Sequence, residues 1–140
     1  MLGIPDGRDL AAAALVSRPD GRPMPTGLTD LREDTWSTLG VEARGRYEAF
    51  GEAAGQYGVD NDHLHLNMIG VRRGRQGRGL GRRLLEHLHA RSAADPASAG
   101  VSLTTELESN VPLYEHFGYR VLGSARVGAA FTTWAMYRPD

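Results

Sequence analysis

The chain has 140 residues, 41% of them hydrophobic and 24% charged, and this composition is typical of a single soluble globular domain, residues 1–140. Its formal net charge of −1 argues against a protein built mainly to bind nucleic acid, and the absence of cysteine excludes disulfides, thiolate metal sites and cysteine nucleophiles. Because no apolar run approaches the ~18 residues of a membrane helix and no signal pattern opens the chain, we expect a cytoplasmic protein without a membrane partner.

The first predicted element is the short apolar run from Leu10 to Ser17 (LAAAALVS), which favours a buried strand or a short helix. The sequence Arg18-Pro19-Asp20-Gly21 then predicts a turn. The prolines at positions 19, 23 and 25 predict a stiff connection after it.

Two helices are predicted next. The first covers residues 30–39, with Asp30 as N-cap, Glu33 at capping-box spacing and Gly40 at its end. The second covers residues 42–56, although it contains three glycines. Its larger apolar residues are spaced for one face, which favours core packing over an aromatic pocket for a substrate: Tyr47, Phe50, Ala54 and Tyr57.

The second half of the chain predicts an alternation of strands and helices. Residues 63–71 (HLHLNMIGV) follow the two-residue alternation of a β-strand, which places on one face His63, His65, Asn67, Ile69 and Val71. The elements expected after it are a helix over 80–91, a strand over 101–107, a short helix over 111–117 capped by Asn110, and a closing antiparallel pair over 119–127 and 129–138. The order predicts an α/β domain with a mixed, mostly antiparallel sheet flanked by helices.

The segment between the strand and the leucine-rich helix, residues 72–85, contains six arginines and four glycines (RRGRQGRGLGRRLL). Glycines allow successive backbone amides to turn towards a bound anion, and the helix that follows presents its positive end. The segment has no Gly-Lys-Ser/Thr ending, so it is no Walker loop, and its glycine spacing is a poor dinucleotide fingerprint. The position and composition therefore predict a phosphate-binding loop.

Two stretches carry a resemblance to a known family. Gln76-Gly77-Arg78-Gly79-Leu80-Gly81 resembles the Gln/Arg-x-x-Gly-x-Gly/Ala signature of the GNAT superfamily of acetyl-CoA-dependent N-acetyltransferases, and it follows Ile69-Gly70-Val71, which looks like the end of that family's fourth strand. Downstream, NVPLYEHFGYRVLG (110–123) is similar to the family's second hallmark. The match covers residues 63–137, in family order.

The resemblance implies a GNAT-like fold and places the earlier segments within it. NVPLY and TTWAMYRPD are most similar to the branch that contains puromycin N-acetyltransferase. Leu10 to Ser17 would be the third strand, and the helices over 30–57 an insertion before the fourth. On this reading the chain is N-terminally incomplete, because it lacks the family's first strand and first two helices.

The resemblance also implies roles for particular residues. Acetyl-CoA would be the co-substrate, and the residues expected to contact it are Ile69, Gly70, Val71, Gln76, Gly77, Arg78, Gly79, Leu80, Gly81 and Asn110. Tyr114 would be the acid that protonates the departing thiolate. Glu106, His65 and His63 remain alternatives for the base. The implied reaction is acetyl transfer to a primary amine of a small molecule by direct attack.

Three other interpretations are weighed against this one. A nucleic-acid module is disfavoured because no aromatic residues interleave with the arginines. The alternative role for these arginines is a face exposed to solvent. A metal is not expected, because the pairs His63/His65 and His87/His89 lack a convincing third ligand. A non-catalytic acyl-CoA-binding or interaction domain of the same fold remains open. We expect a small-molecule amine partner, and a homodimer is compatible with the sequence.

Overall fold

The computed structural model describes residues 1–19 and 25–140. Its strands are β1 (Leu2–Asp6), β2 (Asp9–Ser17), β3 (Leu64–Val71), β4 (Gly100–Thr105), β5 (Arg120–Val127) and β6 (Phe131–Pro139). Its helices are α1 (Thr26–Leu39), α2 (Val41–Gly55), α3 (Leu80–Ala93) and α4 (Val111–His116), with a 3-10 turn at Glu108–Asn110. None of the helices in the described chain has the length and apolar character that crossing a membrane requires.

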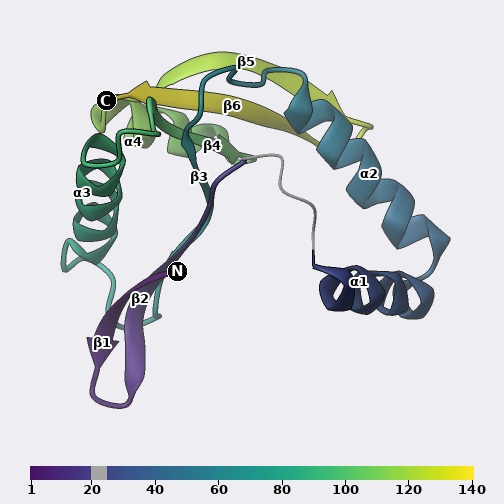
Figure 1. Cartoon of the computed structure of the whole chain (residues 1–140), viewed down its shortest axis with the longest axis horizontal. Helices are drawn as coiled ribbons and strands as arrows, with labels where there is room; N and C mark the ends of the chain where they lie inside the picture. Colours follow the sequence, from purple (N-terminus) through teal and green to yellow (C-terminus); the bar gives the residue numbers. More distant parts are fainter. Residues whose placement is uncertain (20–24) are drawn as a thin grey trace.

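The six strands form one sheet in the order β1-β2-β3-β4-β6-β5 (Figure 1). Only the β3–β4 pair is parallel, and all other neighbours are antiparallel. Helix α3 makes the crossover between the two parallel strands, as such a connection requires. The predicted mixed, mostly antiparallel α/β fold is confirmed.

The core lies between the sheet and α3. The leucine spacing of α3 puts Leu84, Leu85 and Leu88 on one face, where each is at most 3% exposed. They pack against buried side chains of the central strands: Leu66, Val101, Leu103 and Met136. Helix α3 contacts β1, β2, β3 and β4. These contacts fix the N-terminus of α3, and so the glycine-rich segment that precedes it, relative to the strand ends.

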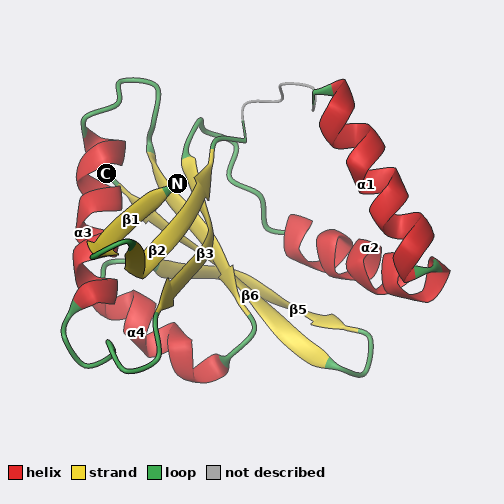
Figure 2. Ribbon diagram, turned by 90° about the horizontal axis from the view of Figure 1, so that it is seen from below, coloured by secondary structure: helices red, strands yellow, loops and turns green. Residues whose placement is uncertain are grey.

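Helices α1 and α2 form a separate pair at the other end of the sheet from α3 and α4 (Figure 2). The two helices meet through Trp36 and Tyr47, whose ring centroids are 5.1 Å apart. Phe50 packs on Phe131 of β6 at 6.2 Å, and the C-terminal half of α2 lies on β5 and β6. Tyr47 therefore faces α1 and is 60% exposed, so the predicted single apolar face of α2 is divided between two neighbours.

Two strands, not the single one expected, precede the helix pair. Residues 2–6 form β1, which pairs with β2 through the two-residue turn Gly7-Arg8, where Gly7 has a φ of +65°. Leu2 and Ile4 alternate with Gly3 and Pro5, two residues that strands disfavour, and this obscures β1 in the sequence. The Asp6-Gly7 dipeptide before an apolar run is a hairpin signal that could have identified it.

Of the two predicted N-caps, Asp30 is wrong and Asn110 is correct in position only. Helix α1 begins at Thr26 after Pro25, which leaves Asp30 in the second turn, and Gly40 ends the helix as expected. Asn110 is the N-cap residue of α4, as predicted, although its side chain makes no capping hydrogen bond. The turn predicted at Arg18–Gly21 and the proline at position 23 extend into residues 20–24, which lie outside the described residues.

Candidate functional site

Strands β3 and β4 separate after a short parallel pairing. Their registered pairs end at Leu66 with Leu103, although β3 continues to Val71 and β4 to Thr105. On its other side β3 stays paired with β2 as far as Val71. Among the described residues, no strand pairs with the edge of residues 67–71 that faces β4, and this edge suits pairing with an extended ligand.

A bulge in β3 occurs where the strands separate. Met68 pairs with Leu15 and Leu66 pairs with Val16, so Asn67 is an extra residue without a partner in β2. The extra residue changes which face each side chain takes: Ile69 and Val71 pack on the same core as Leu66, and Met68 is 70% exposed. The uninterrupted alternation predicted over residues 63–71 is therefore wrong after Asn67.

The glycine loop (residues 72–79) leads from β3 into α3. Gly77 and Gly79 have φ values of +73° and +70°, and a Cβ atom would meet no protein atom within 4 Å at either position. Gly79 is the N-cap of α3 and supplies no side chain to cap the helix. Within the described chain, none of the backbone N–H groups of residues 76–82 donates a hydrogen bond to protein. The loop and helix end thus present unpaired amides beside open space, as an anion site requires.

The arginines of this segment are not equivalent. Arg75 and Arg72 pair with Asp6 and Asp9 of the β1–β2 hairpin, at 2.6 Å and 3.0 Å. Arg82 lies over the ring of Phe117 at 5.6 Å. In the part of the chain that the structure describes, Arg73, Arg78 and Arg83 make no ion pair. Two arginines therefore anchor the loop to the hairpin, and three are available to a ligand.

A cavity of about 390 Å³ lies between β3, the glycine loop and α4. We call it the glycine-loop cavity, and the residues that line it are Ile69, Gly70, Val71, Gln76, Gly77, Gly79, Leu80, Gly81, Arg82, Leu85, Leu113, Tyr114 and Phe117. Of the residues predicted to contact acetyl-CoA, all but Arg78 and Asn110 line it. Of the four catalytic candidates, Tyr114 lines it, and the three alternatives for the base, Glu106, His65 and His63, do not.

Tyr114 joins the cavity from α4. It is 8% exposed, and its ring packs edge-on against Tyr119 with centroids 5.7 Å apart. Burial, and then the nearby negative charge of Glu106, raises the pKa of its hydroxyl. This raised pKa keeps the hydroxyl protonated at neutral pH. The hydroxyl makes no hydrogen bond to another described residue, so it is free to donate.

Asn110 and Glu106 lie at the end of β4. The Asn110 side-chain amide donates to the Thr105 hydroxyl at 3.1 Å, which ties the start of α4 to the strand. Glu106 is exposed and accepts a hydrogen bond from Thr133 of β6 at 3.1 Å. Neither lines the glycine-loop cavity, although Glu106 is close enough to affect the pKa of Tyr114.

His65 of β3 and His63, which comes two residues earlier and just before the strand, lie on the opposite face of the sheet. His65 Nδ1 is 2.8 Å from the Ser102 hydroxyl, and His63 Nδ1 is 2.7 Å from the Asn61 carbonyl. Burial, and then His63, lowers the pKa of His65. Both line a second cavity, beneath α2. Tyr57, which was predicted to serve core packing, also lines this cavity.

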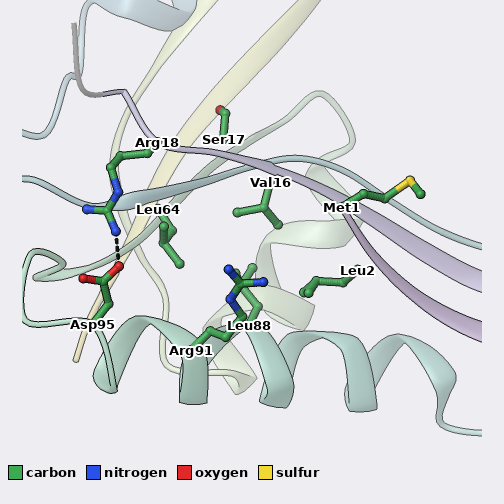
Figure 3. Close-up of a pocket in the computed structure, with 9 residues that line it drawn as sticks. All are labelled: Met1, Leu2, Val16, Ser17, Arg18, Leu64, Leu88, Arg91 and Asp95. Atoms are coloured by element: carbon green, nitrogen blue, oxygen red, sulfur yellow. Dashed lines mark hydrogen bonds and ion pairs between the residues drawn. The ribbon is translucent and has the colours of Figure 1, made fainter. Parts of the chain in front are cut away.

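A third cavity, of about 330 Å³, lies between α3 and the strands β1, β2 and the start of β3 (Figure 3). Leu2, Val16 and Leu88 supply apolar walls, and Arg18 pairs with Asp95 at one side. No residue of the glycine loop or of the separated ends of β3 and β4 lines it. It is therefore remote from the unpaired amides, and we do not assign the chemistry to it.

Solved structures share this fold at low sequence identity. The chain is similar to a protein from Corynebacterium glutamicum described as histone acetyltransferase HPA2 and related acetyltransferase, with 22% identity, a TM-score of 0.63, and coverage of 99% of this chain and 63% of that one. It is also similar to Arabidopsis thaliana NAA60 in complex with acetyl-CoA, with 15% identity, a TM-score of 0.61, and coverage of 98% of this chain and 71% of that one. A third similar structure is Chaetomium thermophilum Naa20 in complex with a bisubstrate analogue, with 16% identity, a TM-score of 0.59, and coverage of 98% of this chain and 64% of that one.

The chain spans 55%, 52% and 63% of the first three solved structures that it matches. Among curated proteins, none matches it. The family model described as acetyltransferase (GNAT) domain matches residues 45–138, which include β3, the glycine loop, α3, α4 and the closing strands. On that match, the chain belongs to the GNAT acetyltransferase family.

Proposed function

We propose that this protein transfers an acetyl group from acetyl-CoA to a primary amine of a small molecule, by direct attack of the amine, in the cytoplasm. The observation that carries the proposal is the combination of an unpaired strand edge, a loop of unpaired amides and a protonated tyrosine around one cavity. Family membership supports the acetyl group as the group transferred. The helix pair between β2 and β3 supports the likeness to the puromycin N-acetyltransferase branch.

The residues present fit acetyl-CoA. The amides of residues 77–81 stand at the start of a 14-residue helix, where backbone groups and the helix dipole favour the pyrophosphate. Arg78 is among the arginines without an ion pair in the described chain, and its guanidinium suits bidentate binding of the 3′-phosphate. The open edge of β3 beyond Leu66 suits the amides of the pantetheine arm.

When bound, acetyl-CoA supplies a thioester whose carbonyl the amine attacks and whose thiolate departs. An unpaired N–H of β3 between residues 67 and 71 donates to the carbonyl oxygen as it gains negative charge. Tyr114 donates its proton towards the departing sulfur, since its raised pKa keeps the hydroxyl protonated. Asn110 holds α4, and so Tyr114, against the end of β4 through Thr105.

The base that removes the proton of the amine is His65 or Glu106. His65 is held by Ser102, and if its Nδ1–H donates to that hydroxyl, Nε2 is free to accept a proton. Glu106 accepts from Thr133 and is exposed, which favours transfer through water. Replacing each in turn separates them: the base is the residue whose loss removes the acidic limb of the pH–rate profile.

The test separates binding from turnover. Acetyl-CoA at 100 times its dissociation constant should raise the free energy of unfolding by about 2.7 kcal/mol. Release of free CoA thiol is then followed with ethylamine, phenethylamine, putrescine and a short peptide as acceptors. Stabilisation without turnover of any amine would favour the alternative, a non-catalytic acyl-CoA-binding domain. Turnover of the peptide alone would replace the small-molecule acceptor with a protein N-terminus.

A further inference from the structure

The cavity beneath α2, which we call the α2 cavity, has a volume of about 260 Å³ and has no role in holding acetyl-CoA. It lies on the face of the sheet opposite α3, because His65, Ser102 and Thr104 alternate with the core residues Leu66 and Leu103. The residues that line it are Pro19, Ala54, Tyr57, Gly58, Val59, His63, His65, Ser102, Leu103, Thr104, Leu122, Ala135 and Met136.

The roof of the α2 cavity is fixed in place by β5. The Tyr57 hydroxyl donates to the Ser124 carbonyl at 3.0 Å. The Tyr57 ring lies directly on Gly123, where a Cβ atom would come within 2.3 Å of the ring. Phe50 on Phe131 holds the preceding turn of α2. A glycine at position 123 is therefore what allows the aromatic roof to close over the sheet.

The floor of the α2 cavity adjoins the point where β3 and β4 separate. His65 immediately precedes Leu66, and Thr104 immediately follows Leu103, and these two leucines form the last parallel pair. The glycine-loop cavity begins on the other side of the sheet at Ile69, beyond the bulge. A molecule in the α2 cavity thus sits across the opening between the strands from the predicted acetyl-CoA site.

The lining of the α2 cavity selects the chemistry of its occupant. Among the described residues that line it, none is a carboxylate, an arginine or a lysine. Its only ionisable groups are His63, His65 and the Tyr57 phenol, and burial lowers the pKa of His65, which keeps that imidazole neutral at pH 7. A second positive charge on the acceptor would have no partner there and would lose its hydration.

Given the proposed transferase function, on which this inference rests, we infer that the α2 cavity binds the uncharged apolar part of the acceptor, an alkyl or phenylalkyl group carrying a single primary amine. The amine then lies at His65, beside the strand opening. A dry apolar cavity of about 150 Å³ holds a benzene molecule, so 260 Å³ has room for a phenylalkyl chain. Diamines, whose second charge has no partner, and small amines without an apolar chain are the acceptors that this cavity disfavours.

Binding is tested first, without turnover. In proton NMR of the whole protein, phenethylamine should shift the His65 Hε1 resonance and leave the exposed His87 and His116 resonances in place. His65→Gln assigns the signal. Putrescine and ethanolamine should bind at least 10-fold more weakly. Equal affinity for the three amines, or an unmoved His65 resonance with phenethylamine, would overturn the inference.

Variants then test the cavity walls. Ala54→Phe fills the cavity from α2 and Gly123→Ala displaces Tyr57, so each should raise KM for phenethylamine at least 10-fold, with the acetyl-CoA Kd unchanged within 2-fold. Ala49→Phe, on the exposed side of the same helix, is the matched control and should change neither. An effect of Ala49→Phe equal to that of Ala54→Phe would overturn the assignment.

The outcome also separates this inference from the proposed function. Phenethylamine binding at His65 without acetyl transfer to any amine would uphold the apolar-amine site and overturn the transferase. Transfer to putrescine and ethanolamine as efficiently as to phenethylamine would uphold the transferase and overturn the site.

Discussion

Arg75 of the glycine loop pairs with Asp6 at the end of β1, its Nε donating to a carboxylate oxygen at 2.7 Å. The two residues are 69 positions apart, and the pair joins the β1–β2 hairpin to the loop whose amides we assign to the pyrophosphate. Since the same carboxylate also lies 3.9 Å from Arg72, one acidic side chain restrains both ends of the turn out of β3.

We predict that Asp6→Asn lowers acetyl-CoA affinity about 3- to 10-fold, because the amide retains the shape but not the charge that orders the loop. Isothermal titration measures the change. Glu86→Gln, which touches Arg82 on the exposed face of α3, is the control and should leave the affinity within 2-fold of wild type. Equal affinities in Asp6→Asn and wild type would mean that the loop is ordered without the hairpin.

Gly79→Val should abolish acetyl-CoA binding while the fold remains intact. A β-branched residue is strained at a φ of +70°, so the N-terminus of α3 must shift and its amides with it. Gly45→Val in α2, where φ is not positive and no protein atom lies within 4 Å of the added Cβ, is the matched control. A folded Gly79→Val protein with wild-type binding would remove the loop amides from the site.

Tyr114→Phe should lower kcat about 10- to 1,000-fold with little change in acetyl-CoA affinity, because only the proton donor is lost. The matched control is Tyr119→Phe, because the Tyr119 ring packs on the Tyr114 ring but Tyr119 does not line the cavity. Steady-state kinetics and a binding titration check both variants. A wild-type kcat in Tyr114→Phe would assign Tyr114 to packing alone.

Stability should fall as the pH is lowered from 6.5 to 4. Burial, and then the charge of Arg138, lowers the pKa of His89 to about 4, while its ordinary value is 6.5. The unfolded chain therefore takes up a proton over this window that the native protein excludes, and stability present above pH 6.5 is lost on acidification. The loss should amount to roughly 1–3 kcal/mol.

Denaturant unfolding at pH 7 and pH 4.5 measures this loss in wild type and in His89→Gln. Glutamine retains a donor for the Tyr119 hydroxyl, which lies 3.1 Å from His89 Nε2, but it does not titrate. The variant should therefore lose less stability than wild type on acidification, whereas His87→Gln on the exposed face of α3 should behave as wild type. The same loss in His89→Gln as in wild type would assign the acid sensitivity to other groups, such as His65.

The elements that the sequence predicts well are those with a strong local pattern. The leucine stripe of α3 and the glycines before it identify the helix and its loop, since both depend on residues close in the chain. The bulge at Asn67 was missed because residues 63–71 alternate without interruption. Met68 continues the alternation of Leu64 and Leu66 in the sequence, although it is exposed in the structure.

The arrangement of the candidate catalytic residues could not be predicted in the same way. The bulge decides that His65 and Ile69 face opposite sides of the sheet. The separation of β3 from β4 after Leu66 and Leu103 creates the opening between the strands at this point. Both depend on pairing between strands distant in sequence, which no local pattern records. The cap at Asp30 failed because Pro25 starts α1 earlier. Asn110 is the N-cap residue of α4, but its side chain donates to Thr105 of β4 and makes no bond to the helix.

The roof over the α2 cavity comes from one continuous segment between β2 and β3, and this has an evolutionary consequence. Residues 54–59 cover the α2 cavity, and none of them touches the glycine-loop cavity on the other face. Mutations in that segment can therefore alter which amine is accepted while the donor site is preserved. A lineage built on this scaffold could diversify its acceptors by changing or exchanging the helix pair, with its acetyl donor unchanged.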